Sequence, residues 1–217
     1  MCGIIAGIYE NIYDVLIDGL YQLQNRGYDS AGICTMYDNT FRIVKKASTD
    51  KINPLEFLRS NQSYGNIGIG HTRWATHGTK TDINSHPHMS MCGNFVLVHN
   101  GIIENYKELC IFLNENGYIM KSETDTEIIV NLLSYFYNLS KNVDKCINET
   151  LKLLQGTWSL VIMSVYSPNT LYVTRNGSPI LIGYDDCNVL ITSEQSGFCN
   201  KMTNYFVLDN NDLCIIN

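Results

Sequence analysis

The chain opens with Met1-Cys2-Gly3-Ile4-Ile5-Ala6-Gly7-Ile8-Tyr9, a cysteine directly after methionine and then an apolar run. Removal of Met1 would make Cys2 the first residue, with its thiol and its α-amino group on one residue. A free α-amine has a pKa of about 7.7–8.0 and an unperturbed thiol about 8.5, so near neutral pH the amine can act as base for the thiol. Such an N-terminal nucleophile is a known variant of the catalytic triad. The alternative interpretation is that Cys2 is a small apolar residue that opens a buried strand.

The composition is that of an ordinary globular protein. The chain has 217 residues, 45% of them hydrophobic and 17% charged, which suits one large domain with a sizeable core. A net charge of −6 and the lack of a lysine or arginine stripe argue against nucleic acid as a partner. No apolar run approaches the ~20 residues that span a bilayer, and no secretory signal is recognisable. We therefore expect no membrane association and a cytoplasmic location.

Eight cysteines are spread along the chain at wide, irregular spacings and without a CxxC pair. Without a signal peptide, such cysteines are expected to be reduced thiols that mostly fill the core. They stand at positions 2, 34, 92, 110, 146, 187, 199 and 214.

The order of helical and strand-like segments predicts a single α+β domain over residues 1–217. Helical spacing of apolar residues recurs in the first two thirds, whereas short β-like runs separated by turn residues follow Gly156. Helices are expected near 13–25, 54–59, 105–116, 124–137 and 143–154. Strands are expected near 4–9, 33–37, 41–45, 66–70, 95–99, 157–166, 171–175, 180–182, 189–192, 205–208 and 213–216. This pattern indicates two packed antiparallel sheets covered by helices.

The histidines are concentrated enough to raise the question of a metal site, since four of the five lie within residues 71–88. The segment HTRWATHG at 71–78 lacks the short i, i+4 histidine pair of a helical zinc motif, and no carboxylate lies between Arg73 and Lys80. An extended His86-Pro87-His88 would put its two imidazoles on opposite sides. We predict no metal and no other cofactor, and interpret the histidines as hydrogen-bonding groups that order loops.

Two charged residues are candidates for binding a substrate. The planar guanidinium of Arg73 matches a carboxylate in two hydrogen bonds, although a single arginine is more often a solvated surface residue. Asp125 stands near the start of a predicted helix, where a carboxylate is favoured by the exposed N–H groups and the dipole. That position alone explains Asp125, and pairing with a substrate ammonium group is the other interpretation.

Asn100-Gly101 directly follows a predicted apolar strand and has two interpretations. Asn-Gly is the strongest short signal for a hairpin turn. Alternatively, the Asn100 side-chain amide and the Gly101 backbone N–H are a pair of donors that face an oxyanion. The hairpin interpretation is weakened because residues 102–106 have a helical pattern of apolar residues and not that of a matching strand.

Together these pieces resemble the glutaminase domain of class II glutamine amidotransferases, within the N-terminal nucleophile hydrolases. The motifs that carry the resemblance occur in the family's order and cover the chain from Cys2 to its end. They are Cys2-Gly3-Ile4, RGYDSAG at 26–32, HTRWATHG at 71–78, NSHPH at 84–88, VHNGIIENY at 98–106, SETDTE at 122–127 and NGSP at 176–179. The set is most similar to the branch that makes glucosamine-6-phosphate. The resemblance implies the four-layer α/β/β/α sandwich of two antiparallel sheets.

The resemblance also implies a mechanism. Cys2 would attack the side-chain amide carbon of L-glutamine with its own amine as general base, and Asn100 with Gly101 would hold the tetrahedral oxyanion. Arg73 would clamp the substrate α-carboxylate, and Asp125 would pair with the α-ammonium group. The products would be glutamate and ammonia, formed through a thioester.

Four further residues receive roles from the resemblance. Thr76 and His77 would be substrate-binding residues that help to shape the loop over the substrate, and the other two would be supporting residues. Trp74 resembles a residue that gates the passage of ammonia towards a second site, and Arg26 would position the N-terminus.

Full-length enzymes of this branch continue with a sugar-phosphate isomerase half of two similar domains, which this chain does not contain. Fructose-6-phosphate therefore cannot bind here as in the full enzyme, and we expect isomerase domains, in cis or in trans, as the ammonia acceptor. If Met1 stays attached, Cys2 has an amide in place of its amine and the base is lost. The chain would then be a non-catalytic glutamine-binding or regulatory module. Another alternative, an N-terminal nucleophile amidase acting on a different amide, is disfavoured by Arg73 and Asp125.

Overall fold

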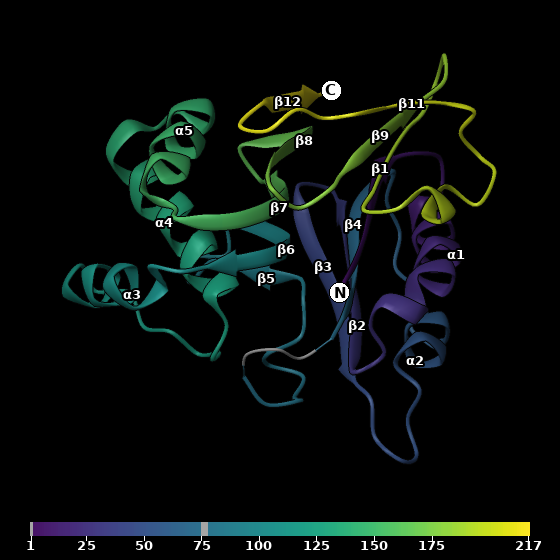
Figure 1. Ribbon diagram of the computed structural model, residues 1–217, viewed down its shortest axis with the longest axis horizontal. Coiled ribbons are helices and arrows are strands. Elements are labelled where there is room, and N and C mark those ends of the chain that lie inside the picture. Colours follow the sequence, from purple (N-terminus) through teal and green to yellow (C-terminus); the bar gives the residue numbers. More distant parts are fainter. Residues whose placement is uncertain (1, 75–77) are drawn as a thin grey trace.

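The computed structural model of the protein describes residues 2–74 and 78–217. Two antiparallel β-sheets face each other, and helices cover the outer face of each sheet (Figure 1). Helices α1 and α2 lie against one sheet, and α3, α4 and α5 lie against the other, on the opposite side of the molecule. This arrangement confirms the predicted α+β fold of four layers.

The larger sheet has seven strands in the described residues. Their spatial order is β11 (Asn204–Val207), β9 (Leu181–Tyr184), β10 (Val189–Thr192), β1 (Gly3–Ile8), β4 (Ile67–Arg73), β2 (Ser30–Tyr37) and β3 (Thr40–Ala47). Strand β1 is central, so the residue that precedes it, Cys2, is held at one end of the sheet. The sequence-adjacent strands β2 and β3 form a hairpin whose turn residues, Asp38 and Asn39, both have positive φ.

The smaller sheet has five described strands. Their order is β12 (Leu213–Ile216), β8 (Ser167–Asn176), β7 (Gly156–Ser164), β6 (Phe95–Ile103) and β5 (His88–Met89). Strand β6 is longer than the sequence predicts, because it continues through Asn100-Gly101 to Ile103 in register with β7. Asn100-Gly101 is therefore not a hairpin turn.

Helices flank the two sheets. They are α1 (Ile12–Leu23), the 3-10 turn η1 (Gln24–Arg26), α2 (Pro54–Ser60), α3 (Tyr106–Glu115), α4 (Asp125–Ser140), α5 (Val143–Leu153) and the 3-10 turn η2 (Gln195–Phe198). All five predicted helices are present, with boundaries that differ by a few residues. Among the described residues, no helix is long and apolar enough to cross a membrane.

Alternation of apolar side chains along the strands fills three separate cores. In β1, Ile4 and Ala6 point between the sheets, whereas Ile5 packs against α1. In β6, Val96 points between the sheets and Phe95 packs under the helices α4 and α5. Burial of both faces explains why these strands appear in the sequence as continuous apolar runs.

The start of α4 is fixed by side-chain caps, and this matters because Asp125 is its first residue. The Thr124 hydroxyl accepts a hydrogen bond from the Glu127 N–H at 3.4 Å, so Thr124 is the N-cap of the helix. The Glu127 carboxylate does not return to Thr124. It accepts instead from the N–H groups of Lys121 and Ser122, so the preceding loop is tied to the same turn.

Candidate active site

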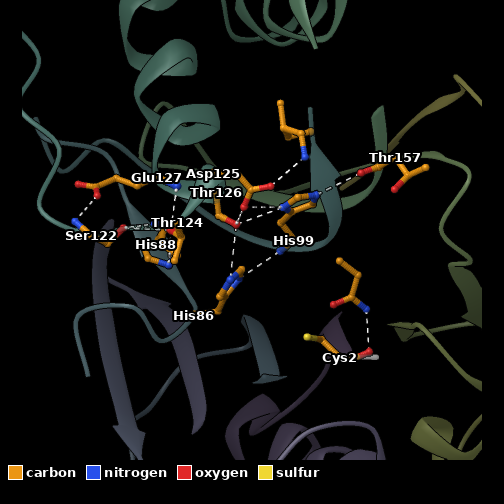
Figure 2. A network of polar contacts seen from close by, with 12 residues as sticks. Cys2, His86, His88, His99, Ser122, Thr124, Asp125, Thr126, Glu127 and Thr157 are labelled. Atoms are coloured by element: carbon orange, nitrogen blue, oxygen red, sulfur yellow. Dashed lines mark hydrogen bonds and ion pairs between the residues drawn. The ribbon is translucent and has the colours of Figure 1, made fainter. Parts of the chain in front are cut away.

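Two segments from elsewhere in the sequence meet at the main chain of Cys2. The Asn100 side-chain amide donates to the Cys2 carbonyl oxygen at 2.9 Å, and the Arg26 Nε–H donates to the same oxygen at 3.3 Å. Figure 2 shows the first of these contacts as a dashed line at Cys2. The end of β6 and the turn after α1 therefore hold the residue that precedes β1.

The Cys2 thiol lies beside the end of β4. The Trp74 backbone N–H donates to Cys2 Sγ at 3.2 Å. Burial raises the pKa of the thiol, while the Trp74 N–H and the positive charges of Arg73 and Arg26 act in the opposite direction. Because the net shift is upward, the thiol stays protonated near neutral pH and needs a proton acceptor before it can act as a nucleophile.

Arg26 is held by a carboxylate that sequence reasoning missed. Its guanidinium forms an ion pair with Glu194, a residue just after β10. The hydrogen bond from Arg26 lowers the pKa of Glu194. The neighbouring Ser193 hydroxyl accepts from the Ile4 N–H at 3.0 Å, so this loop also ties down β1. The segment carries no motif, and only its place in the sheet brings it to Arg26.

Arg73 is the last residue of β4 and is buried at 5% exposure. Its Nη1 donates to the Thr79 carbonyl oxygen at 3.4 Å. Burial lowers the pKa of Arg73, whereas Cys2 and the carboxylates of Asp29 and Asp125 raise it. The guanidinium therefore lies within electrostatic range of both the thiol and Asp125.

The segment at residues 78–84 is anchored by Glu123, a contact that sequence reasoning also missed. The Oε2 atom of Glu123 accepts from the Thr79 N–H at 2.8 Å, the Thr79 hydroxyl at 2.9 Å and the Asn84 side-chain amide at 2.8 Å. The Glu123 N–H in turn donates to Asn84 Oδ1. These bonds join the loop that begins at Gly78 to the segment just before Asp125.

Asp125 projects from the N-terminus of α4 towards the end of β6. Its Oδ2 accepts from the Ile103 N–H at 2.9 Å, and its Oδ1 lies 3.9 Å from His99 Nδ1 (Figure 2). The side chain keeps 20% exposure, so part of the carboxylate remains available to a ligand. The same carboxylate therefore fixes the geometry of β6 beyond Gly101.

Trp74 is half exposed and packs edge-on against Tyr28, with ring centroids 5.3 Å apart. Its backbone contacts the Cys2 thiol while its side chain stays accessible. Thr76 and His77, which the sequence also nominates, lie outside the described residues.

Gly101 occupies a backbone conformation that only glycine adopts easily. Its φ is +141°, and a Cβ at this position would lie 2.0 Å from the Thr157 carbonyl oxygen. Gly101 is exposed near the C-terminal end of β6, next to the half-buried Asn100. Glycine thus allows β6 to stay paired with β7 while it bends at the candidate site.

Gly101→Ala is expected to lower the free energy of unfolding by about 3 kcal/mol, because backbone strain and the clash with Thr157 add together. Gly93→Ala is the matched control: its φ is also positive at +75°, but nothing lies within 4 Å of the added Cβ. That variant should lose only about 1 kcal/mol. Urea unfolding of both variants measures the difference, and equal losses would contradict the proposed clash.

Four described histidines form a buried cluster between the sheets and α4. Their ring contacts run from His71 to His86, stacked at 4.1 Å, and from His86 to His88, edge-on at 4.8 Å. The expectation of imidazoles on opposite sides of 86–88 is therefore wrong, because the segment is not extended there and both rings turn inward (Figure 2). Among residues 2–74 and 78–217, no group of side chains suited to a metal is found.

Burial keeps these imidazoles neutral. It lowers the pKa of His71 to about 3, and lowers the pKa values of His86, His88 and His99 as well. Each of His71, His88 and His99 has at least one ring nitrogen within hydrogen-bond distance of a hydroxyl or a carbonyl oxygen. The interpretation of the histidines as groups that order loops agrees with these contacts.

The cluster predicts acid sensitivity. His71, His86 and His88 titrate near 6.5 when unfolded and far lower when folded, so the unfolded chain binds more protons in that window and stability falls as the pH drops below about 6.5. Between pH 7 and pH 5.5 each fully buried histidine should remove about 1 kcal/mol, or about 3 kcal/mol in total for His71, His86 and His88. Urea unfolding at the two pH values checks this, and a constant unfolding free energy would contradict it.

A large groove lies at the other end of the larger sheet. It has a volume of about 1210 Å³ and is lined by the tip of the β2–β3 hairpin, residues 62–67 and Asn217. None of the candidate site residues that the structure describes lines it. The groove is therefore separate from the surroundings of Cys2.

Of the eight cysteines, all are free, but only Cys34 and Cys146 are buried. The prediction that most of them fill the core is wrong. Cys2 is half-buried at a site that joins both sheets, whereas Cys187 is exposed in a surface turn.

The fold and this site define a glutamine amidotransferase domain: residues 71–200 match the family model described as "Glutamine amidotransferase domain", and the chain belongs to this family. Two relatives that match nearly the whole chain are glutamine–fructose-6-phosphate aminotransferases. A probable one from Acanthamoeba polyphaga mimivirus is 42% identical over 98% of this chain, and one from Buchnera aphidicola subsp. Baizongia pistaciae is 41% identical over 100%. The chain spans 36% of the length of each of these relatives.

A solved structure supports the fold. Glutamine phosphoribosylpyrophosphate amidotransferase from B. subtilis superposes with a TM-score of 0.83 over 100% of this chain and 47% of its own, at 24% identity. The predicted fold, two packed antiparallel sheets with helices on their outer faces, is therefore confirmed.

Proposed function

We propose that this domain is an enzyme that hydrolyses L-glutamine to glutamate and ammonia, with Cys2 as the nucleophile. The observation that carries the proposal is the convergence on Cys2 of an amide donor, Asn100, and a buried guanidinium, Arg73. Membership of the glutamine amidotransferase family supports the choice of substrate.

Substrate selection in this proposal uses two opposite charges. Arg73 binds the α-carboxylate of glutamine in a bidentate pair, and Asp125 binds the α-ammonium group. Both side chains come from ends of elements, β4 and α4, that hydrogen bonds fix in place. A free α-amino acid offers both charges, which disfavours a peptide amide as substrate.

The chemistry begins when the α-amine of Cys2, freed by removal of Met1, takes the thiol proton. The sulfur then forms a bond to the side-chain amide carbon of glutamine, and the carbonyl oxygen becomes an oxyanion. Asn100 and the Gly101 N–H donate to that oxyanion. The C–N bond breaks, the ammonium form of Cys2 returns the proton to the leaving nitrogen, and water hydrolyses the thioester to glutamate.

Supporting roles fall to residues around this centre. Arg26 holds the Cys2 main chain through its Nε–H, and Glu194 orients Arg26. Thr76 and His77 complete the loop over the substrate, and Trp74 gates the exit of ammonia. These roles follow from the motif positions of the residues.

The ammonia is proposed to reach fructose-6-phosphate bound by sugar-phosphate isomerase domains, in cis or in trans. The names of the relatives, which are glutamine–fructose-6-phosphate aminotransferases, support this acceptor. The product in that case is glucosamine-6-phosphate. The eight free thiols suit a reducing compartment, and we place the protein in the cytoplasm.

Covalent labelling tests the proposal. The purified protein is treated with an electrophilic glutamine analogue, and the adduct is located by peptide mass mapping. We expect one adduct on Cys2, formed more slowly when glutamine is present. Labelling of another cysteine, or none, would favour a non-catalytic glutamine-binding or regulatory module. Protection by asparagine as well as by glutamine would argue against the assigned substrate.

A further inference from the structure

The imidazole of His71 lies directly behind Asn100. Its Nε2 atom is 3.0 Å from Asn100 Oδ1 and 3.1 Å from the His99 carbonyl oxygen. Both of these atoms accept hydrogen bonds, so Nε2 must carry the proton and donate to them. The Asn100 side chain therefore has His71 on one side and the Cys2 carbonyl oxygen on the other.

The other nitrogen of His71 agrees with this tautomer. Nδ1 is buried, and among the described residues it has no hydrogen-bond partner. An imidazole with its proton on Nε2 leaves only a lone pair at Nδ1, which costs less to bury alone than an N–H group. A protonated ring would leave an N–H group without an acceptor.

The neighbouring rings hold His71 in place. His86 stacks on His71 with the two ring planes 13° from parallel. His86 in turn accepts from the His99 N–H at 3.4 Å through Nδ1, and its Nε2 lies 3.5 Å from the Thr126 hydroxyl. Figure 2 shows His86, His99 and Thr126 pointing towards one another above Cys2. The ring of His71 is thus fixed by packing as well as by its own hydrogen bonds.

The two contacts of Asn100 determine which way its amide points. With Oδ1 towards His71 and Nδ2 towards Cys2, a donor meets an acceptor on each side. A rotation of 180° would put the amide NH₂ against the His71 N–H and the amide oxygen against the Cys2 carbonyl oxygen. Both contacts would then be repulsive, so one orientation is selected.

We propose that His71 is a positioning residue that acts through Asn100: its Nε2–H fixes the amide so that the NH₂ group faces Cys2. One N–H of that group holds the Cys2 main chain, and the other is left for the oxyanion. The inference deepens the proposed glutamine hydrolysis and rests on it. Burial lowers the pKa of His71 to about 3, so the same donor is present throughout the neutral pH range.

Two amide replacements of His71 separate this role from a general structural one. Glutamine places an NH₂ donor near the position of Nε2, whereas asparagine places it near Nδ1, out of reach of Asn100. Both are neutral, polar and smaller than the imidazole. We expect His71→Gln to keep kcat within about fivefold of the wild type. His71→Asn should lower kcat by about ten- to a hundredfold with KM nearly unchanged. This loss is smaller than the ~100- to 1,000-fold loss of kcat expected when an oxyanion donor itself is removed.

His88 supplies the matched control, because it is equally buried in the same cluster but bonds to the Thr124 hydroxyl at 3.2 Å and not to Asn100. His88→Asn should leave kcat within about threefold of the wild type. Equal losses of kcat in His71→Asn and His88→Asn would overturn the inference, and so would equal kcat values for His71→Asn and His71→Gln.

A double-variant cycle tests the route through Asn100. In the Asn100→Ala background no amide remains to be oriented, so His71→Asn should change kcat by less than about twofold. A loss as large as in the wild-type background would show that His71 acts on its own, and would contradict the inference.

A spectroscopic measurement on the wild-type protein does not depend on turnover or on the folding of variants. Two-bond ¹H–¹⁵N correlation of the imidazole nitrogens should show His71 as a neutral ring with its proton on Nε2 from pH 6.5 to pH 8. A proton on Nδ1, or a charged ring, would overturn the inference. A protein with the expected His71 tautomer that fails to hydrolyse glutamine would instead refute the proposed function alone.

Discussion

Cys2→Ser is expected to reduce kcat for glutamine hydrolysis by at least about a thousandfold, because a hydroxyl beside an amine base is a far weaker nucleophile than a thiol. The contacts of Cys2 with Asn100 and Arg26 use its carbonyl oxygen, so they survive the change. Stability and glutamine affinity should therefore stay close to the wild type. Ammonia release measured at saturating glutamine gives kcat, and calorimetric titration gives the affinity.

Cys187→Ser is the control for the loss of a thiol. Cys187 is exposed in the turn that Asp185 caps, far from β1 in the sequence and outside the candidate site. Its replacement should leave kcat within about twofold. Turnover by Cys2→Ser above a hundredth of the wild-type rate would contradict the requirement for a thiol at this position.

Retention of Met1 should lower kcat for glutamine hydrolysis about as much as loss of the Cys2 thiol does. If Met1 stays attached, the nitrogen of Cys2 is an amide without basicity, and the raised pKa of the thiol leaves it protonated. Intact mass spectrometry of the assayed sample decides the point. Normal turnover by protein that retains Met1 would exclude the amine as base, even if Cys2 is the nucleophile.

The fold was predictable because its signals are local or periodic. Both sheets are buried on two faces, so their strands form apolar runs such as 4–8 and 95–98, and turn residues separate them. The cap of α4 at Thr124 could be recognised from a spacing of three residues. Such features depend on neighbours along the chain, and sequence reasoning finds them reliably.

The supporting contacts of the site were not predictable, because each joins single polar residues across a long stretch of chain. Glu194 reaches Arg26 across 168 positions, and Glu123 reaches Thr79 across 44. Neither carboxylate belongs to a periodic pattern, and although Glu123 lies in the motif at 122–127, nothing in that motif indicates Thr79 as its partner. Glu194 comes near Arg26 only because the sheet order puts β10 beside β1, and Glu123 meets Thr79 only where the loop after Gly78 folds against the start of α4.

Asn100 illustrates both situations. Its place after an apolar strand made Asn100 a candidate oxyanion donor, but the same dipeptide, Asn100-Gly101, also predicted a hairpin turn. The structure removes the hairpin because β6 stays paired with β7 from Phe95 to Ile103. Its contacts with His71 and Cys2 depend on both sheets, and no property of residues 98–106 alone indicates them.

Asn100→Ala is expected to lower kcat for glutamine hydrolysis by about 100- to 1,000-fold, the usual effect of removing one oxyanion donor. The variant also loses the bond to the Cys2 carbonyl oxygen, but Arg26 Nε–H still donates to that atom. Binding of glutamine uses Arg73 and Asp125 in the proposed mechanism, so KM should change by less than about threefold. The loss should thus appear in kcat, as expected for an interaction made mainly in the transition state.

Asn105→Ala is the matched control, because Asn105 also bridges two segments: its amide donates to the Leu153 carbonyl oxygen at 2.8 Å and its oxygen accepts from the Gln155 N–H at 3.1 Å. These contacts are with the end of α5 and the residue before β7 and not with Cys2, so the loss of Asn105 should reduce stability while leaving kcat within about twofold. Steady-state kinetics at matched folded fractions compare the two variants. If Asn100→Ala retains more than a tenth of the wild-type kcat, the amide does not stabilise the oxyanion, and its role is then confined to holding the main chain of Cys2.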